Sequence, residues 1–316
     1  MMAGKVKVSI CIPAYKRTEY LKRLLDSIRR QTYQNFEVII SDDSPDNSVS
    51  DLIKDFATEL NIRYYKNNVP LGTPSNWNFC ISKANGDWIK LMHDDDWFTD
   101  DKSLQNFVNH TNLGKKFIFS AYVNVYAGFQ VKKNAVHIKH AWKKTIIKQP
   151  GLLLAQNIVG PPSVTLLHHS IKEKYDERLK WRVDMEYYIR VLKNESNFTY
   201  IDIPLVNVGI SETQVTQSCI YKPEVELPEG YILLEKHGTG QLKNIWIYDA
   251  WWRLLRNMKI RKKEQLERYV SNEWPAAIVS MVSDLDTCPE MFLKAGISSK
   301  LFMVISYFKN FRKIKQ

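Results

Sequence analysis

The chain has 316 residues, 44% of them hydrophobic, and a formal net charge of +11 at pH 7. It is long enough to bury a substantial core, and we expect one main domain with an appended piece. Its four cysteines are far apart and no apolar run approaches about 18 residues, which argues against a disulfide scaffold, a zinc ribbon and a membrane-spanning helix. No signal peptide precedes Lys5, and Cys11 lies in a predicted core strand. We therefore expect a cytoplasmic protein with reduced, buried thiols.

The first hundred residues alternate apolar strands with amphipathic helices. The predicted strands are residues 6–13, 36–41, 62–65 and 88–92, and the predicted helices are residues 18–30, 49–56 and 75–85. Leucines and isoleucines recur on one side of the first helix, at the spacing of a helix laid on a sheet. Gly86 stands where a glycine commonly follows the end of a helix. The alternation predicts an α/β fold, with a Rossmann-like, mostly parallel sheet flanked by helices.

Three consecutive aspartates, Asp94, Asp95 and Asp96, directly follow the fourth predicted strand. Like charges this close repel one another, and burial at the end of a core strand adds to the cost. A bound cation would relieve the repulsion, and hard oxygen ligands favour Mg²⁺ or Mn²⁺ over Zn²⁺. A solvated turn whose acids cap the next helix is the alternative interpretation.

Polar residues also follow two other predicted strands. Tyr15 and Arg17 come after the first strand, and Asp42 and Asp43 come after the second. Ligands of open parallel sheets bind at the carboxyl ends of the strands, where all these groups would meet. A ring, a cation, paired acids and a metal-type cluster suit a nucleotide diphosphate, although each residue also has an ordinary structural explanation. No glycine-rich phosphate loop is present, which points away from P-loop and dinucleotide-binding proteins.

Several segments occur in a specific order: Val8–Arg17, Leu24–Ile28, Gln31–Val38, Ser41–Ser44, Ala84–Ile89 and His93–Asp96. In this order and spacing they resemble the nucleotide-binding half of family 2 glycosyltransferases, which have the GT-A fold. The last segment stands where that family keeps its metal-binding DXD motif. The match is close over residues 6–110 and looser beyond them.

The resemblance implies a nucleotide-binding role for five residues. Pro13 and Tyr15 would hold a uracil-type base, and Asp43 would accept a hydrogen bond from that base. Asp42 would support the loop beside it, and Arg17 would approach the diphosphate.

The resemblance also implies a site for Mn²⁺ or Mg²⁺. Asp96 would be the principal metal ligand and Asp94 the other arm of the motif, with Asp95 nearer the ribose. The triplet departs from the usual spaced pair, so which two carboxylates touch the metal stays open.

The segment Lys180–Arg190 resembles the part of the family that carries an aspartate at the start of a helix. Asp184 would there be the catalytic base, because a sugar hydroxyl is a poor nucleophile until a carboxylate takes its proton. Glu186 is the fallback, and a helix-start aspartate stabilised by the helix dipole is the plain alternative. Asn157–Ser163 would face the acceptor, and Ile210–Gln217 would form a flap near the diphosphate.

The reaction implied by the resemblance is a single displacement with inversion at the anomeric carbon. The donor would be a nucleotide diphosphate sugar, with a UDP-sugar preferred, and the acceptor would be a hydroxyl of a glycan or lipid-linked molecule. For a small soluble member of this kind, bacterial surface polysaccharide synthesis is the family's commonest setting, and we expect it here.

The expected division is a glycosyltransferase domain at 5–226, with nucleotide and acceptor halves at 5–110 and 111–226, and a mainly helical C-terminal extension at 227–316. Residues 1–110 hold 14 Lys and Arg against 15 Asp and Glu, and the remainder holds 31 against 19. The positive excess lies outside the nucleotide half, where anionic membrane lipid, a lipid-diphosphate acceptor or an acidic glycan would suit it. It is spread out and no recognition module accompanies it, so we expect no nucleic acid partner.

Two segments of the extension are informative. Ile245–Leu255 is rich in aromatic residues, for which core packing against the main domain is expected rather than a binding surface. Residues 297–316 mix apolar and basic side chains, which fits either a peripheral helix on the inner face of a membrane or a docked terminal helix.

Two other functions stay open at this point. A sugar-nucleotide nucleotidyltransferase would also combine a nucleotide-binding sheet with acids and a metal, but Pro13–Arg17 does not resemble its glycine-rich loop. A non-catalytic nucleotide- or glycan-binding protein is the other alternative, and the intact acids argue against it.

Overall fold

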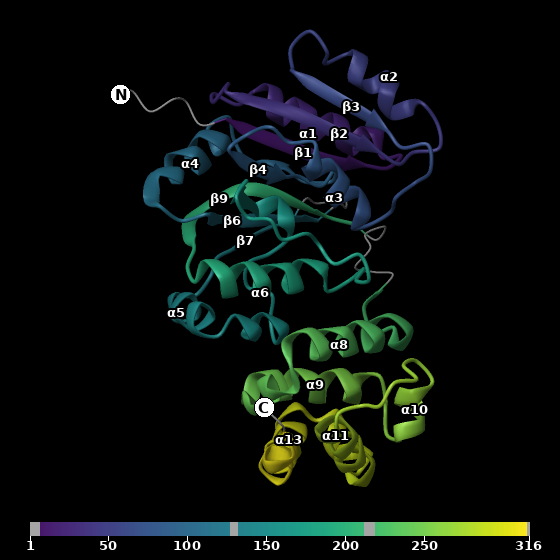
Figure 1. Ribbon diagram of the computed structural model, residues 1–316. Coiled ribbons are helices and arrows are strands. Elements are labelled where there is room, and N and C mark those ends of the chain that lie inside the picture. Colours follow the sequence, from purple (N-terminus) through teal and green to yellow (C-terminus); the bar gives the residue numbers. More distant parts are fainter. Residues whose placement is uncertain (1–6, 127–131, 212–218, 315–316) are drawn as a thin grey trace. The chain divides into compact units, whose positions relative to one another are not determined.

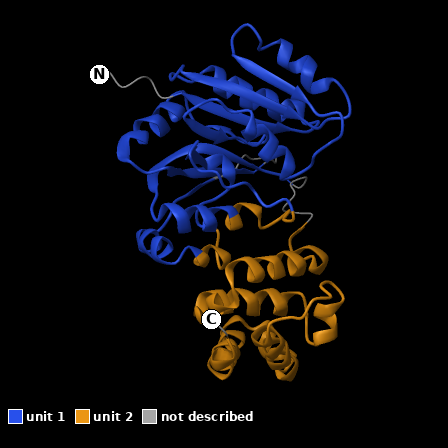
Figure 2. Cartoon of the chain, viewed as in Figure 1, with its two compact units in different colours: residues 1–150, 158–177, 187–212 blue, residues 151–157, 178–186, 213–316 orange. Residues whose placement is uncertain are grey.

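The computed structural model describes residues 7–126, 132–211 and 219–314, which form two compact units (Figure 2). One unit comprises residues 1–150, 158–177 and 187–212, and the other comprises residues 151–157, 178–186 and 213–316. Buried apolar side chains occur in both units. The predicted division at residue 226 stays a prediction, and helix α8 (Pro223–His237) runs across that position.

The first unit contains the predicted parallel sheet. Its first four strands are β1 (Val8–Ala14), β2 (Phe36–Asp42), β3 (Ile62–Lys66) and β4 (Trp88–Leu91). They lie in the order β3-β2-β1-β4 and all pair in parallel (Figure 1). β1 and β4 are apolar and almost wholly buried, as expected for central strands of a parallel sheet covered on both faces. The predicted α/β class is confirmed.

The crossovers between these strands are the predicted helices. They are α1 (Thr18–Arg29), α2 (Ser48–Lys54) and α3 (Ser75–Ser82). The apolar stripe of α1 is buried, and α3 packs on β1 and β2. The strand ends that carry the polar residues therefore share one edge of the sheet.

The expected role of Gly86 at the end of a helix is wrong, because α3 ends at Ser82. A Cβ atom on Gly86 would lie 2.7 Å from the backbone nitrogen of Ser9 and 2.8 Å from its Oγ. The glycine is required because the chain passes directly against β1 at this point.

The rest of the first unit adds antiparallel pairings that the sequence pattern did not predict. The further strands are β5 (Trp97–Phe98), β6 (Phe117–Tyr126), β7 (Lys132–Val136), β8 (Thr165–His168) and β9 (Thr199–Ile210). Within the described residues they extend the sheet to nine strands, in the order β3-β2-β1-β4-β8-β6-β9-β5 with β7 on β6. β8 runs antiparallel to β4, whereas β9 runs parallel to β6. The helices α4 (Ser103–Asn109) and α5 (His140–Lys148) belong to the first unit, as does α6 (Val183–Glu195) from residue 187 on, while its first residues belong to the second unit.

The second unit is mainly helical, as predicted. After α8 it contains α9 (Ile245–Asn257), α10 (Lys263–Glu267), α11 (Ala276–Thr287), α12 (Glu290–Lys294) and α13 (Gly296–Asn310). α9, α11 and α13 pack against one another (Figure 1). Tyr248, Trp251 and Trp252 of α9 are buried, which confirms that the aromatic stripe is core; packing of the stripe against the main domain stays a prediction.

All four cysteines are free and buried. In the part of the chain that the structure describes, no helix has both the length and the apolar character needed to cross a membrane.

Candidate active site

The three aspartates lie in the turn between β4 and β5, and all three are buried. Arg17 reaches them from the start of α1. Its Nη2 and Nε pair with both carboxylate oxygens of Asp94, and its Nη1 lies 3.0 Å from Oδ2 of Asp95. The structure thus brings together two groups that the sequence placed after different strands. Burial raises the pKa of Asp94 to about 7, although the charge of Arg17 acts against this rise.

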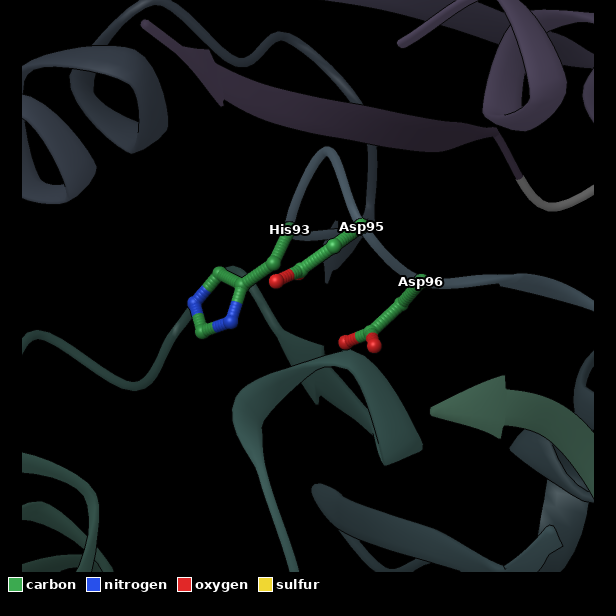
Figure 3. A group of neighbouring side chains, drawn as sticks. All are labelled: His93, Asp95 and Asp96. Carbon is green, nitrogen blue, oxygen red and sulfur yellow. The ribbon is translucent and has the colours of Figure 1, made fainter. Parts of the chain in front are cut away.

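Asp95 and Asp96 form a second group with His93. One ligand atom from each lies within 4.8 Å of the others, and Figure 3 shows the three side chains gathered in one place. Burial raises the pKa of Asp96 well above its ordinary range, and the charge of Asp95 adds to the effect. Burial also lowers the pKa of His93 to about 4, so its imidazole is neutral near pH 7.

These residues fit a divalent cation. The buried Nε2 of His93 has no hydrogen-bond partner among the described residues. A cation would provide that partner and would stabilise carboxylates whose charge burial disfavours. His93 was not predicted as a ligand, whereas Asp94 was predicted and is not among the three residues of this group. The assignments of Asp94 and Asp96 to the metal stay predictions.

Lys90 and Ser163 lie beside the acidic turn; Lys90 was not predicted, and Ser163 was predicted only as the last residue of the acceptor loop. Lys90 is wholly buried in β4 and donates to the carbonyl oxygens of Ser163 and, at 3.2 Å, Thr165. Burial lowers the pKa of Lys90 to about 7, while Asp96 acts to raise it. The hydroxyl of Ser163 accepts from the backbone nitrogen of His93 at 2.9 Å and also hydrogen-bonds to Asp96. The sequence did offer a signal for Lys90, because a lysine inside a short apolar strand just before acidic residues is unusual. It offered none for the contact of Ser163 with the acidic turn.

Asp42, the last residue of β2, and Asp43, which follows it, are held by hydrogen bonds to neighbouring residues. The wholly buried Asp42 accepts from Ser44 N, Tyr64 Oη and Lys66 Nζ at 2.7 to 3.0 Å. The carboxylate of Asp43 accepts from three donors of the loop after β3: Asn67 Nδ2, Leu71 N and Gly72 N. Asp43 thus ties that loop to the edge of the sheet. A contact of either acid with a nucleotide stays a prediction.

Pro13 and Tyr15 lie at the end of β1 beside these acids. Asp43 N donates to Ala14 O at 3.0 Å, which joins the two strand ends. The ring of Tyr15 is 49% exposed, with Lys16 Nζ 4.9 Å from its centroid. The ring is therefore available for stacking, which stays a predicted role.

Asp184 belongs to the second unit and lies in the first turn of α6. It is partly exposed; its Oδ2 accepts from Asn157 Nδ2 at 2.7 Å, and its Oδ1 accepts from Met185 N at 2.8 Å. Burial raises the pKa of Asp184 to about 6, and the charge of Glu229 adds to the rise. A carboxylate with this pKa can gain and lose a proton near neutral pH. Its catalytic role stays a prediction.

Helix α8 holds the turn that precedes Asp184. Both oxygens of Glu229 accept hydrogen bonds from three successive backbone nitrogens, those of residues 180, 181 and 182, at 2.7 to 3.1 Å. Glu226 on the same helix lies 2.9 Å from Nη2 of Arg182. The wholly buried Glu186 pairs with Lys236 at 2.7 Å and lies 3.5 Å from His237. The burial of Glu186 and its pairing with Lys236 favour Asp184 over Glu186 as the base.

The predicted flap, Ile210–Gln217, lies mostly outside the described residues, which omit 212–218. The predicted acceptor loop is Asn157–Ser163. At its start Asn157 hydrogen-bonds to Asp184, and at its end Ser163 hydrogen-bonds to the backbone of His93, beside the acidic turn.

Comparison with known proteins agrees with this architecture. The profile of the family described as glycosyl transferase family 2 matches residues 9–171. The chain therefore belongs to glycosyltransferase family 2, and its fold is the GT-A fold of those enzymes.

Two relatives illustrate the range of similarity. WcaA of Escherichia coli, named for colanic acid biosynthesis, is 26% identical over 69% of this chain and 78% of its own length. A glycosyltransferase of Rickettsia bellii is 37% identical over 117 residues. The matched part is 36% of this chain and only 16% of that relative's length.

Two solved structures share the fold. Residues 1–349 of TarS from S. aureus, in complex with UDP-GlcNAc, superpose with a TM-score of 0.57 at 14% identity, covering 97% of this chain and 92% of that one. The mannosyltransferase PcManGT of Pyrobaculum calidifontis, in complex with GDP-Man and Mn²⁺, gives 0.54 at 11% identity, covering 98% and 88%.

Proposed function

We propose that the protein is a metal-dependent, inverting glycosyltransferase that moves a sugar from a nucleotide diphosphate sugar, preferably a UDP-sugar, to a hydroxyl of a glycan or lipid-linked acceptor. The observation that carries the proposal is the group of His93 and the buried Asp95 and Asp96 at the carboxyl edge of a GT-A sheet. Membership of the family weighs against the nucleotidyltransferase and the non-catalytic binding protein.

The nucleotide would bind at the edge formed by β1 and β2. Tyr15 offers an exposed ring for the base beside Pro13, and Asp43 fixes the loop that would border it. Arg17 is the cation nearest the acids, so an anionic diphosphate would compete with Asp94 and Asp95 for its guanidinium. UDP-GlcNAc bound to TarS supports a uridine nucleotide.

Asp96, with Asp94 or with His93 and Asp95, would hold the cation. Carboxylates suit Mg²⁺ and Mn²⁺ alike, and an imidazole ligand favours Mn²⁺. Mn²⁺ bound to PcManGT supports the same choice. When bound, the cation would supply positive charge that stabilises the leaving diphosphate.

Asp184 would take the proton of the acceptor hydroxyl as that oxygen attacks the anomeric carbon. Its hydrogen bonds to Asn157 and to its own helix fix the carboxylate, so the proton acceptor is already oriented. Attack opposite the diphosphate inverts the configuration of that carbon.

The setting we propose is bacterial surface polysaccharide synthesis, with the enzyme in the cytoplasm and peripheral on the inner face of the membrane. The relative WcaA, named for colanic acid biosynthesis, supports the pathway class. The positive excess of residues 111–316 supports an anionic surface or acceptor.

The test is release of nucleoside diphosphate from a panel of UDP-sugars, with Mn²⁺ and a panel of sugar hydroxyl acceptors. We expect the Asp184→Asn variant to bind donor as the native protein does and to transfer about 10²- to 10⁴-fold more slowly. Full transfer activity in this variant would refute the assignment of the base. Formation of pyrophosphate from a nucleoside triphosphate and a sugar 1-phosphate, in a separate assay, would instead show the rival nucleotidyltransferase chemistry.

A further inference from the structure

Helix α13 has two unlike faces. One face is buried against the second unit and consists largely of polar residues: Ser299, Met303, Ser306, Tyr307 and Asn310. The opposite face is exposed and apolar. Large apolar side chains on the surface of a helix that is already packed call for an explanation.

The exposed face forms a continuous stripe. Ile297, Leu301, Ile305 and Phe308 follow one another at steps of three or four residues, so they lie on one side of the helix. Ile297 is 90% exposed, Leu301 61% and Phe308 70%. Met291, from the adjoining α12, is also exposed. We call these five residues the α13 stripe.

Hydrogen bonds on the buried face fix the rotation of α13. Ser306 Oγ lies 2.7 Å from Tyr248 Oη, and Asn310 Nδ2 donates to Asp284 Oδ2 at 2.7 Å. Trp252 Nε1 donates to Ser299 Oγ at 3.1 Å. Turning the apolar stripe inward would break these buried hydrogen bonds and leave their donors unsatisfied. The stripe is therefore held facing outward (Figure 1 shows α13 beside α11).

Basic residues border the stripe. At about 100° per residue, Lys300 lies on one side of it and Lys309 on the other, and α13 itself contains no Asp or Glu. Lys309 pairs with Asp284, while Arg312 and Lys313 follow just beyond the helix. After Cys288 the chain has six basic residues and one acidic residue.

We propose that the α13 stripe docks on an anionic lipid bilayer, with its apolar side chains in the interface and its basic border against the headgroups. The inference deepens the proposed peripheral membrane location and does not depend on the catalytic assignments. An apolar face bordered by Lys and Arg is the pattern of a helix that lies in a membrane interface. A second copy docking through the same surface by two-fold symmetry would instead bring basic borders together.

The experiment is cosedimentation of the full chain with vesicles of phosphatidylglycerol and phosphatidylcholine in equal parts, and with phosphatidylcholine alone. We expect binding to the anionic vesicles that weakens with salt. The double variant Leu301→Gln/Phe308→Gln should bind about 100-fold more weakly. Lys300→Glu should weaken binding at least about fivefold, since each basic residue near such a surface contributes on that scale.

The matched control is Leu113→Gln, which changes a leucine that is 57% exposed in the first unit. It should bind vesicles like the native protein, and unchanged melting temperatures will show that every variant is folded. Absence of native binding to anionic vesicles, or equal binding by the double variant, overturns the proposal. Self-association that only the double variant loses, without vesicle binding, would assign the stripe to a second copy.

Discussion

The carboxylate of Asp184 accepts hydrogen bonds from Asn157 and from the backbone of Met185, and burial raises its pKa to about 6. Both hydrogen bonds favour the charged form, so burial is the stronger influence. A base must be deprotonated before it can accept a proton. Because the pKa is raised, Asp184 is protonated and inactive at pH values at which an ordinary aspartate would already be charged.

We therefore predict that kcat/KM for the acceptor rises about tenfold per pH unit below pH 6 and reaches a plateau above it. At subsaturating acceptor the profile reports the enzyme before the acceptor binds, and burial raises the pKa of Asp184 to about 6 in that state. The measurement is transfer rate against pH at subsaturating acceptor. A flat profile across this range would contradict the assignment of Asp184 as the base. In the Asp184→Asn variant the rise of kcat/KM with pH should disappear, together with most of the activity.

At the scale of secondary structure, α8 determines where Asp184 stands. Glu229 accepts from three backbone nitrogens of the turn at residues 180–182, and Glu226 pairs with Arg182. A carboxylate that receives several backbone donors is a strong local constraint. Helix α8 thus orients the start of α6, on which the proposed base is carried.

We predict that Glu229→Ala lowers the free energy of unfolding by about 3 kcal/mol, because three backbone donors lose a charged acceptor. The variant should also shift the rise of activity to lower pH, since the charge of Glu229 helps to raise the pKa of Asp184. Denaturant unfolding and the pH profile measure the two effects. Glu224→Ala, an exposed acid on the same helix, is the control and should change stability by less than about 1 kcal/mol. A loss of stability without a shift in the pH at which activity rises would mean that Glu229 acts on the fold alone.

Local patterns predicted the elements but not the contacts between distant ones. The stripe of α1 and the strand ends bearing Asp42 and Asp94 could be predicted, because helical spacing and strand punctuation are local features. The links of Lys90 to Ser163 and of Glu229 to residue 180 join segments 73 and 49 positions apart. No periodicity encodes such pairs. The antiparallel strand β8 was missed for the same reason, since its partners β4 and β6 are distant in the chain.

Across the whole chain, the net charge differs between the first 110 residues and the rest. Residues 1–110 are nearly neutral and carry three of their 15 acidic residues in one buried turn, while residues 111–316 carry the positive excess. A donor site with a cation and a basic membrane-facing extension would use these two features separately. Salt should therefore weaken vesicle binding much more than binding at the buried acids.

The central claim is that the acidic turn binds a nucleotide diphosphate through a divalent cation. Its most direct test is titration calorimetry of UDP into the native protein and the Asp96→Ala variant, with and without Mn²⁺. Asp101→Ala removes an exposed acid of the same stretch and serves as the control. We predict UDP binding that requires both Mn²⁺ and Asp96 and is unchanged in Asp101→Ala. UDP binding of equal affinity without Mn²⁺, or in Asp96→Ala, would contradict the account.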